Sequence, residues 1–256
     1  MQKPMKLIKN TAKLLLSTSL SLTAIFGTVS QAEAVLITSG NATFVFNNDS
    51  ALFSGGGGPF IMDRYYGPGV ATETAADITA GVGGTPIVMP PSLVNLSANF
   101  NGSSVINPAG RARQTTNLDV DFSNVLGTWG VGERIGIDFV LRTNVGPLFG
   151  GGTIVLGDFS LTNNSGTLVL VNNFSFPADT FTIGSPVITD LGTGFSVSGD
   201  LLVSTSLSLL TGGLVPVGTN AGSFSLVAIP EPSSLALLTL AAGGLWLSRR
   251  KRSAGC

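Results

Sequence analysis

The chain has 256 residues, no histidine and a single cysteine, Cys256. This composition excludes catalytic triads built on histidine and the common zinc sites, and it leaves no thiol nucleophile in the body of the chain. Residues 35–229 carry five arginines, no lysine and twelve acidic residues, a net charge of −7, so we expect no binding of nucleic acid.

Residues 1–34 have the three parts of a secretory signal peptide. Four lysines precede an apolar segment at residues 14–29, and the small-residue box Ala32-Glu33-Ala34 follows it. We therefore expect a signal helix, export by the general secretion machinery and cleavage after Ala34. The alternative is an N-terminal membrane anchor, for which the apolar segment is short and is interrupted by serine and threonine.

Alternation of apolar and polar residues dominates residues 35–229 and predicts β-strands. The clearest examples lie at residues 94–100, 117–122, 134–142, 195–209 and 224–229. A hairpin is predicted through Asn163-Asn164-Ser165-Gly166, because these residues tolerate the positive φ of a tight turn. No pattern of an amphipathic helix separates the strands.

Many short strands joined by Gly, Pro and Asn turns indicate an all-β fold. We expect one antiparallel β-sandwich or jelly-roll domain over residues 35–229. Since this region has no cysteine, burial of apolar side chains must stabilise it without disulfides.

Residues 54–92 form the longest irregular stretch of the predicted domain and contain the only tyrosines, Tyr65 and Tyr66, beside Asp63 and Arg64. Aromatic rings next to charged groups suit contact with a sugar. The preferred alternative is that the two tyrosines fold back onto the domain. Trp129, in a second glycine-rich loop, has the same two interpretations: a glycan contact or a cover for the core.

Carboxylates are the remaining candidates for chemistry. Asp119 and Asp121 share one strand face, and Glu133 and Asp138 follow. A glycoside hydrolase needs two carboxyl groups facing each other across a cleft, one of them with a raised pKa. We expect these residues to be solvated structural carboxylates, with a calcium site or catalysis as alternatives; no loop with calcium-ligand spacing supports the calcium site. We predict no catalytic residue, metal or cofactor.

The last stretch, residues 230–256, consists of three ordered blocks. Pro230-Glu231-Pro232 cannot lie inside a helix, because proline fixes φ and lacks a backbone donor. An uncharged apolar segment follows, and a helix over residues 233–248 would be roughly 24 Å long, slightly short of a bilayer core of about 30 Å. The basic cluster Arg249-Arg250-Lys251-Arg252 then ends the apolar run. We predict a transmembrane helix whose basic end stays in the cytoplasm.

These three blocks together resemble the PEP-CTERM sorting domain of surface and secreted proteins of Gram-negative bacteria. The resemblance covers about the last tenth of the chain, and the extension Ser253-Ala254-Gly255-Cys256 after the basic cluster departs from the pattern. It implies processing near Pro230, Glu231 and Pro232 by an exosortase, a membrane-embedded cysteine transpeptidase or protease. It also implies a bacterium that makes extracellular polysaccharide.

The sequence therefore predicts an exported, non-enzymatic protein of the cell surface or extracellular matrix, structural or adhesive and associated with exopolysaccharide. Its inner-membrane form would be a transient intermediate. The alternatives are a carboxylate-based polysaccharide hydrolase and a surface protein whose tail stays in the membrane as an anchor.

Overall fold

The computed structural model describes residues 35–47, 49–53, 61–67, 72–86, 93–101, 105–144, 152–174 and 176–230. The predicted signal peptide, with Ala32 and Ala34, lies outside the described residues. So do Glu231, Pro232 and the basic cluster of residues 249–252. Pro230 is described, and it is the last residue of a strand.

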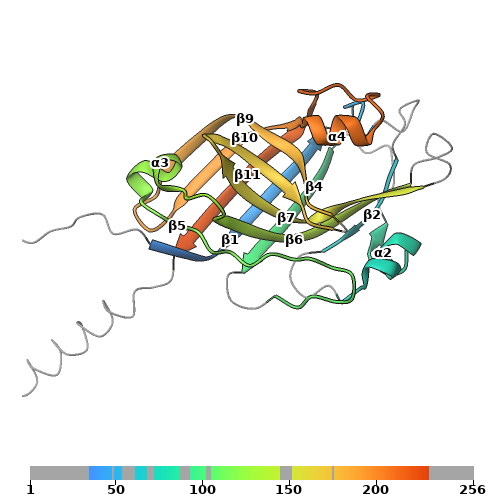
Figure 1. The fold of residues 1–256 in the computed structure, drawn as a ribbon, viewed down its shortest axis with the longest axis horizontal. Coiled ribbons are helices and arrows are strands. Elements are labelled where there is room, and N and C mark those ends of the chain that lie inside the picture. The colour runs from blue at the N-terminus through green and yellow to red at the C-terminus, as the bar shows by residue number, and fades with distance from the viewer. Residues whose placement is uncertain are drawn as a thin grey trace, which may run out of the picture. The chain divides into compact units, whose positions relative to one another are not determined.

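Within these ranges, eleven strands form one sheet (Figure 1). The strands are β1 (Val35–Asn47), β2 (Ile61–Tyr66), β3 (Thr85–Pro86), β4 (Leu93–Asn101), β5 (Asp119–Val120), β6 (Arg134–Asn144), β7 (Thr153–Asn164), β8 (Thr167–Asn172), β9 (Ala178–Asp190), β10 (Phe195–Val203) and β11 (Asn220–Pro230). Three short α-helices and one 3₁₀ helix join them: α2 (Ala75–Ala80), η1 (Phe122–Asn124), α3 (Val125–Thr128) and α4 (Thr205–Leu210).

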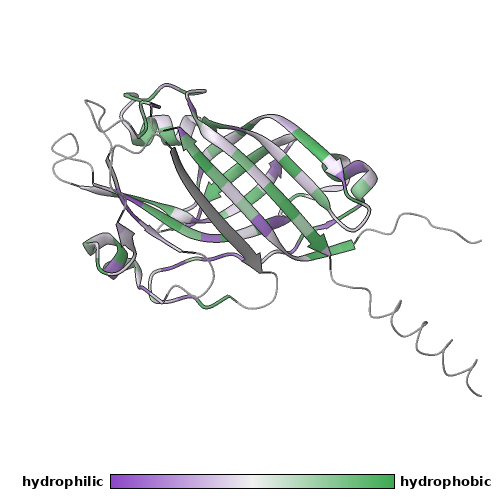
Figure 2. Cartoon of the chain, turned by 180° about the vertical axis from the view of Figure 1, so that it is seen from behind, coloured by the Kyte–Doolittle hydropathy of each residue, from purple (hydrophilic) through white to green (hydrophobic). Residues whose placement is uncertain are grey.

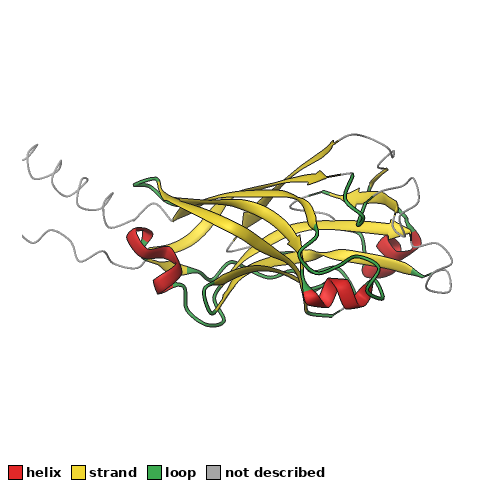
Figure 3. Ribbon diagram, turned by 90° about the horizontal axis from the view of Figure 1, so that it is seen from above, coloured by secondary structure: helices red, strands yellow, loops and turns green. Residues whose placement is uncertain are grey.

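All the described strand pairs are antiparallel, in the order β3-β2-β6-β7-β8-β9-β10-β11-β1-β4, with β5 paired to β1. The sheet curls so that its end strand β4 comes beside β6, and the strands lie in two layers (Figure 3). The prediction of a mostly antiparallel β fold is confirmed. The two layers belong to one continuous hydrogen-bonded sheet.

The inward side chains form one hydrophobic core between the layers. Phe44 of β1 is central: its ring lies 4.6 Å from that of Phe139 and 5.1 Å from that of Phe224, between centroids. Phe139 in turn contacts Phe159 at 5.1 Å. Such tilted aromatic pairs add about 0.5–1.5 kcal/mol each beyond their buried area. The alternating bands of hydropathy along the strands in Figure 2 show why only one face of most strands contributes.

The outer face of β2, β6 and β7 is covered by helix α2 and by the irregular residues 105–118. Residues 105–118 are here called the covering segment. Together with α2 they enclose a small second core against this face. That core contains Tyr66, Ile78, Val140 and Phe174. Strand β6 is therefore buried on both faces, unlike a strand whose outer face meets water.

Several predicted strands are confirmed and two are wrong in part. The hairpin is observed at Ser165 and Gly166, whose φ values of 53° and 89° are those of a type I′ turn. The alternation at residues 195–209 is strand only to Val203, because Ser204 caps helix α4 by accepting a hydrogen bond from the Leu207 amide. At residues 117–122 only Asp119–Val120 is strand, because Asp121 caps η1. Residues 54–92 contain β2, α2 and β3.

Candidate functional site

The three aromatic residues proposed as glycan contacts are packed to different degrees. Tyr66 is 1% exposed and Trp129 5% exposed, and the Trp129 Nε1 donates to the Glu133 carbonyl at 3.1 Å. Burial raises the pKa of the Tyr66 phenol, against the nearby Arg142. Tyr65 is half-buried against the main core. Because the rings of Tyr66 and Trp129 are covered, this arrangement favours the alternative that these residues complete the packing.

The predicted carboxylates have separate roles. Asp119 is exposed, and Asp121 accepts from the Ser123 amide at 2.8 Å as the cap of η1. Glu133 accepts from the Gly130 amide at 2.6 Å. In the described ranges, no group of three His, Cys, Asp or Glu residues is arranged to hold a metal ion.

Asp138 is not the solvated carboxylate that the alternation predicted. It is 4% exposed and lies in a bulge of β6 opposite Asp158, under the covering segment. Burial raises the pKa of Asp138 to about 6, although the neighbouring Arg113 opposes the shift. The sequence pattern failed here because the covering segment, distant in the chain, removes water from the outer face of β6.

Around Asp138 the structure places a charge cluster that the sequence did not reveal: Arg111, Arg113, Asp138 and Asp158. Nε of Arg111 donates to both carboxylate oxygens of Asp158, at 3.1 and 2.8 Å, and its Nη2 makes an ion pair with the same group. The Arg111 guanidinium also lies 5.8 Å from the centre of the Phe174 ring. The side chains of Arg111 and Asp158 are fully buried. Two cations and two anions give the cluster no net charge.

This charge cluster attaches the covering segment to the sheet. Asp158 also accepts from the Ala112 amide at 3.2 Å, and Arg111 donates to the Glu73 carbonyl at 3.2 Å. The Nη1 of Arg113 donates to the Ile106 carbonyl at 3.1 Å. These bonds satisfy a buried ion pair and join three chain segments. Because the side chains of its central pair, Arg111 and Asp158, are fully buried, we assign the cluster a structural role.

A different part of the sheet exposes a regular polar surface, here called the hydroxyl face. It is the outer face of β9, β10, β11 and β1, where hydroxyl and amide side chains alternate along the strands with buried core residues such as Phe44, Phe224 and Leu226. Seven of these polar side chains belong to Asn41 and Thr43 of β1, Thr189 of β9, Ser196 and Ser198 of β10, and Ser223 and Ser225 of β11; Ser39 and Thr182 lie on the same face.

Strand register places these side chains in rows across the sheet. Ser198 pairs with Ser225, which pairs with Thr43, and Ser196 pairs with Thr189 in the next row. Neighbouring strands in a sheet are about 4.8 Å apart, and residues on one face repeat about every 6.6 Å along a strand. Valines interrupt the rows: Val227 lies between Ser196 and Asn41, and Val187 pairs with Ser198. Both valines are exposed, so the hydroxyl face is a set of small polar groups interspersed with apolar ones.

Within the described side chains, the seven named residues make no side-chain hydrogen bond to another residue. The four strands contain no lysine or arginine, and Asp200 is the one acidic residue paired within the rows. Such a surface offers many hydrogen-bonding groups and one negative charge, that of Asp200.

No protein-family model, curated protein or solved structure matches this chain. Among the described helices, none combines the length and the apolar character needed to cross a membrane. The predicted tail helix lies outside the described residues.

Proposed function

We propose that this chain is an exported surface or extracellular-matrix protein, processed by an exosortase through residues 230–256, whose domain adheres to neutral exopolysaccharide. The hydroxyl face carries the adhesive part of the proposal. Polysaccharide hydroxyls both donate and accept hydrogen bonds, as do serine and threonine, and a surface with one charged group can contact them with little desolvation of ionic groups. The β-sandwich or jelly-roll assignment belongs to this proposal too, since the halves of the curled sheet face each other across one core.

The sorting part rests on the order of the three sequence blocks in residues 230–256. Its position in the fold is compatible with processing, because β11 extends to Pro230, the first residue of the Pro-Glu-Pro box. A cut close to the box would therefore leave β11 intact. The transient passage through the inner membrane and release to the surface follow from the same blocks.

Binding is tested with the exported chain and polysaccharide purified from the producing strain. Replacing Ser198 and Ser225 by valine removes two neighbouring hydroxyl groups, and valine is a residue that favours β-strands. With about 0.5–1.5 kcal/mol per hydrogen bond, the double variant should bind roughly tenfold more weakly. Thr167→Val, at an exposed position of β8 off this face, is the matched control and should bind like the parent protein. Equal binding by all three proteins would refute the adhesive role.

Sorting is tested by mass spectrometry of the C-terminal peptide from fractionated cells. Processing predicts a mature chain ending near the Pro-Glu-Pro box and absent from the membrane fraction in an exosortase-positive strain. A mature chain ending at Cys256 in the membrane would support the alternative of a permanent anchor. The hydrolase alternative gains no support from the cavity beside α4, whose lining includes one carboxylate, Asp179, where hydrolysis needs two.

A further inference from the structure

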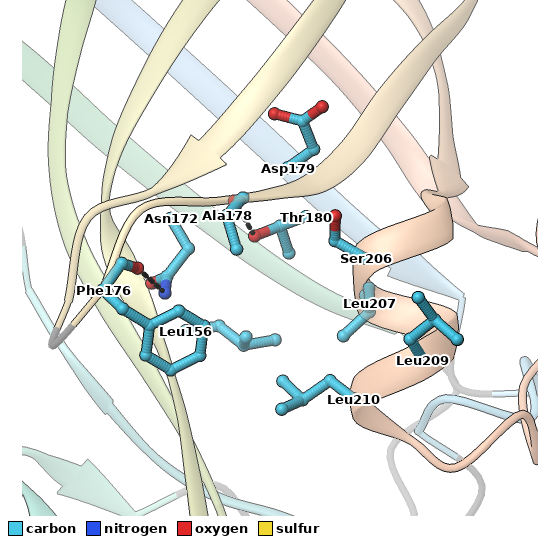
Figure 4. Close-up of a pocket in the computed structure, with 10 residues that line it drawn as sticks. All are labelled: Leu156, Asn172, Phe176, Ala178, Asp179, Thr180, Ser206, Leu207, Leu209 and Leu210. Atoms are coloured by element: carbon cyan, nitrogen blue, oxygen red, sulfur yellow. Dashed lines mark hydrogen bonds between the residues drawn. The ribbon is translucent and has the colours of Figure 1, made fainter.

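A cavity of about 370 Å³ opens between helix α4 and the region where β8 leads into β9 (Figure 4). Leu156 and Leu207 are buried in its lining, and Leu210 is half-buried. At the margin, Phe176 is 49% and Leu209 74% exposed, which is costly for side chains of this size. The cavity has the size and apolar lining typical of small-ligand sites, at the lower end of their volume range.

Hydrogen bonds hold both walls of the cavity in place. The buried Asn172 donates to the carbonyls of Phe174 and Phe176, at 3.1 and 3.2 Å, and so fixes the loop that carries the Phe176 ring. On the other wall, the Ser204 hydroxyl donates to the Asp179 carbonyl at 2.6 Å while it caps α4. The site is therefore formed before a ligand arrives, which lowers the entropic cost of binding.

The charge of the lining selects among apolar ligands. Asp179 is the one ionisable residue in the lining, and no basic residue accompanies it. Figure 4 shows its carboxylate at one margin, turned away from the leucines and the Phe176 ring. A head group placed at that margin meets a negative charge, so an anionic head is disfavoured.

We propose that this cavity binds the aliphatic chain of a single-chain amphiphile with an uncharged head group. The chain lies against the leucines and Phe176, and the head reaches the margin with Asp179 and the Ser206 hydroxyl. Ligand binding would cover Phe176 and Leu209. This site does not depend on the sorting tail or the hydroxyl face, so its test is independent of the proposed function.

The test uses the full chain and the neutral fluorescent probe N-phenyl-1-naphthylamine, displaced by dodecanol or by dodecanoate. Dodecanol should displace the probe, and dodecanoate should bind roughly fivefold more weakly because of Asp179. Asp179→Asn should remove that difference. Leu210→Trp and Ser206→Trp fill the cavity from two positions on α4, and each should weaken probe binding at least tenfold.

Leu214→Trp is the matched control, since Leu214 is 51% exposed and is not in the cavity lining. Any probe bound elsewhere on the chain contributes equally to this control and to the filling variants. Circular dichroism establishes whether the variants are folded. If Leu210→Trp does not fold, Ser206→Trp still tests the cavity. The proposal would be overturned by equal probe binding by the filling and control variants, or by tighter binding of dodecanoate than of dodecanol. Binding of the chain to phosphatidylcholine vesicles without binding of dissolved dodecanol would also overturn it.

Discussion

Replacement of Asp158 by asparagine tests whether the buried charge cluster holds the covering segment on the sheet. Asp158 has a φ of 49°, in the left-handed region that asparagine and aspartate tolerate best, so Asp158→Asn keeps the backbone and the side-chain shape. The change removes one negative charge from a site where the Arg111 and Asp158 side chains are both fully buried. The loss of stability therefore measures the charge together with one hydrogen-bond acceptor, because both oxygens of Asp158 accept from Arg111 and asparagine keeps only one oxygen.

The expected loss is about 3 kcal/mol, because removing one partner leaves the Arg111 guanidinium buried and uncompensated. In a domain of this size that corresponds to a fall in melting temperature of roughly 6–12 °C. Urea and thermal unfolding followed by circular dichroism measure it, and hydrogen exchange should show residues 105–118 opening first. Asp119→Asn, at an exposed position, should change stability by less than about 0.5 kcal/mol. A similarly small effect of Asp158→Asn would refute the role given to the cluster.

Two further variants examine the same covered face. Burial raises the pKa of Asp138 to about 6, above its value in the unfolded chain. The folded state therefore binds more protons than the unfolded state between about pH 4 and 6. As the pH rises through that window, the free energy of unfolding of the parent protein falls by on the order of 2 kcal/mol. Asp138→Asn removes this contribution, so urea unfolding should show its stability rising relative to the parent from pH 4.5 to 7; a constant difference would contradict the pKa. A Cβ at Gly136 would clash with the Gln114 carbonyl oxygen of the covering segment, so Gly136→Ala should cost about 1–3 kcal/mol and speed hydrogen exchange at residues 105–118. Gly67→Ala, with open space around its Cβ, is the control, and equal exchange in both variants would disprove the close contact.

Alternation of apolar and polar residues predicted the position of several strands, although not what covers their outer faces. The alternation at residues 94–100 and 134–142 and the turn at Ser165 and Gly166 correspond to β4, β6 and the β7–β8 hairpin. The alternation at 195–209 misled because Leu207 and Leu209 continue the period of two into α4. Ser204, the N-cap of that helix, was a usable signal, because a serine side chain can accept a hydrogen bond from the backbone amide three residues later and so begin a helix.

The charge cluster was missed because its partners are far apart in sequence. Arg111 and Asp158 are separated by 47 positions, and nothing periodic marks the covering segment. A signal did exist in β7, where Asp158 interrupts the otherwise apolar run of Val155, Leu156 and Phe159. A charge inside such a strand indicates a buried partner, and two of the five arginines between residues 35 and 229 stand at positions 111 and 113.

The arginines of residues 35–229 lie on β2, on β6 and in the covering segment, and not on the strands of the hydroxyl face, which we propose to contact a partner. All five arginines between residues 35 and 229 fall within residues 64–142, and Arg111, Arg113 and Arg142 fix the layer over β2, β6 and β7. Strands β9, β10, β11 and β1 have none, so substitutions on the hydroxyl face leave the contacts of these arginines intact. Strand β11 also carries Ser223 and Ser225 between two hydrogen-bonded neighbours and ends at Pro230. Processing near Pro230 would therefore place the new C-terminus on a central strand of the hydroxyl face, which links the proposed sorting event to the proposed adhesive surface through one strand.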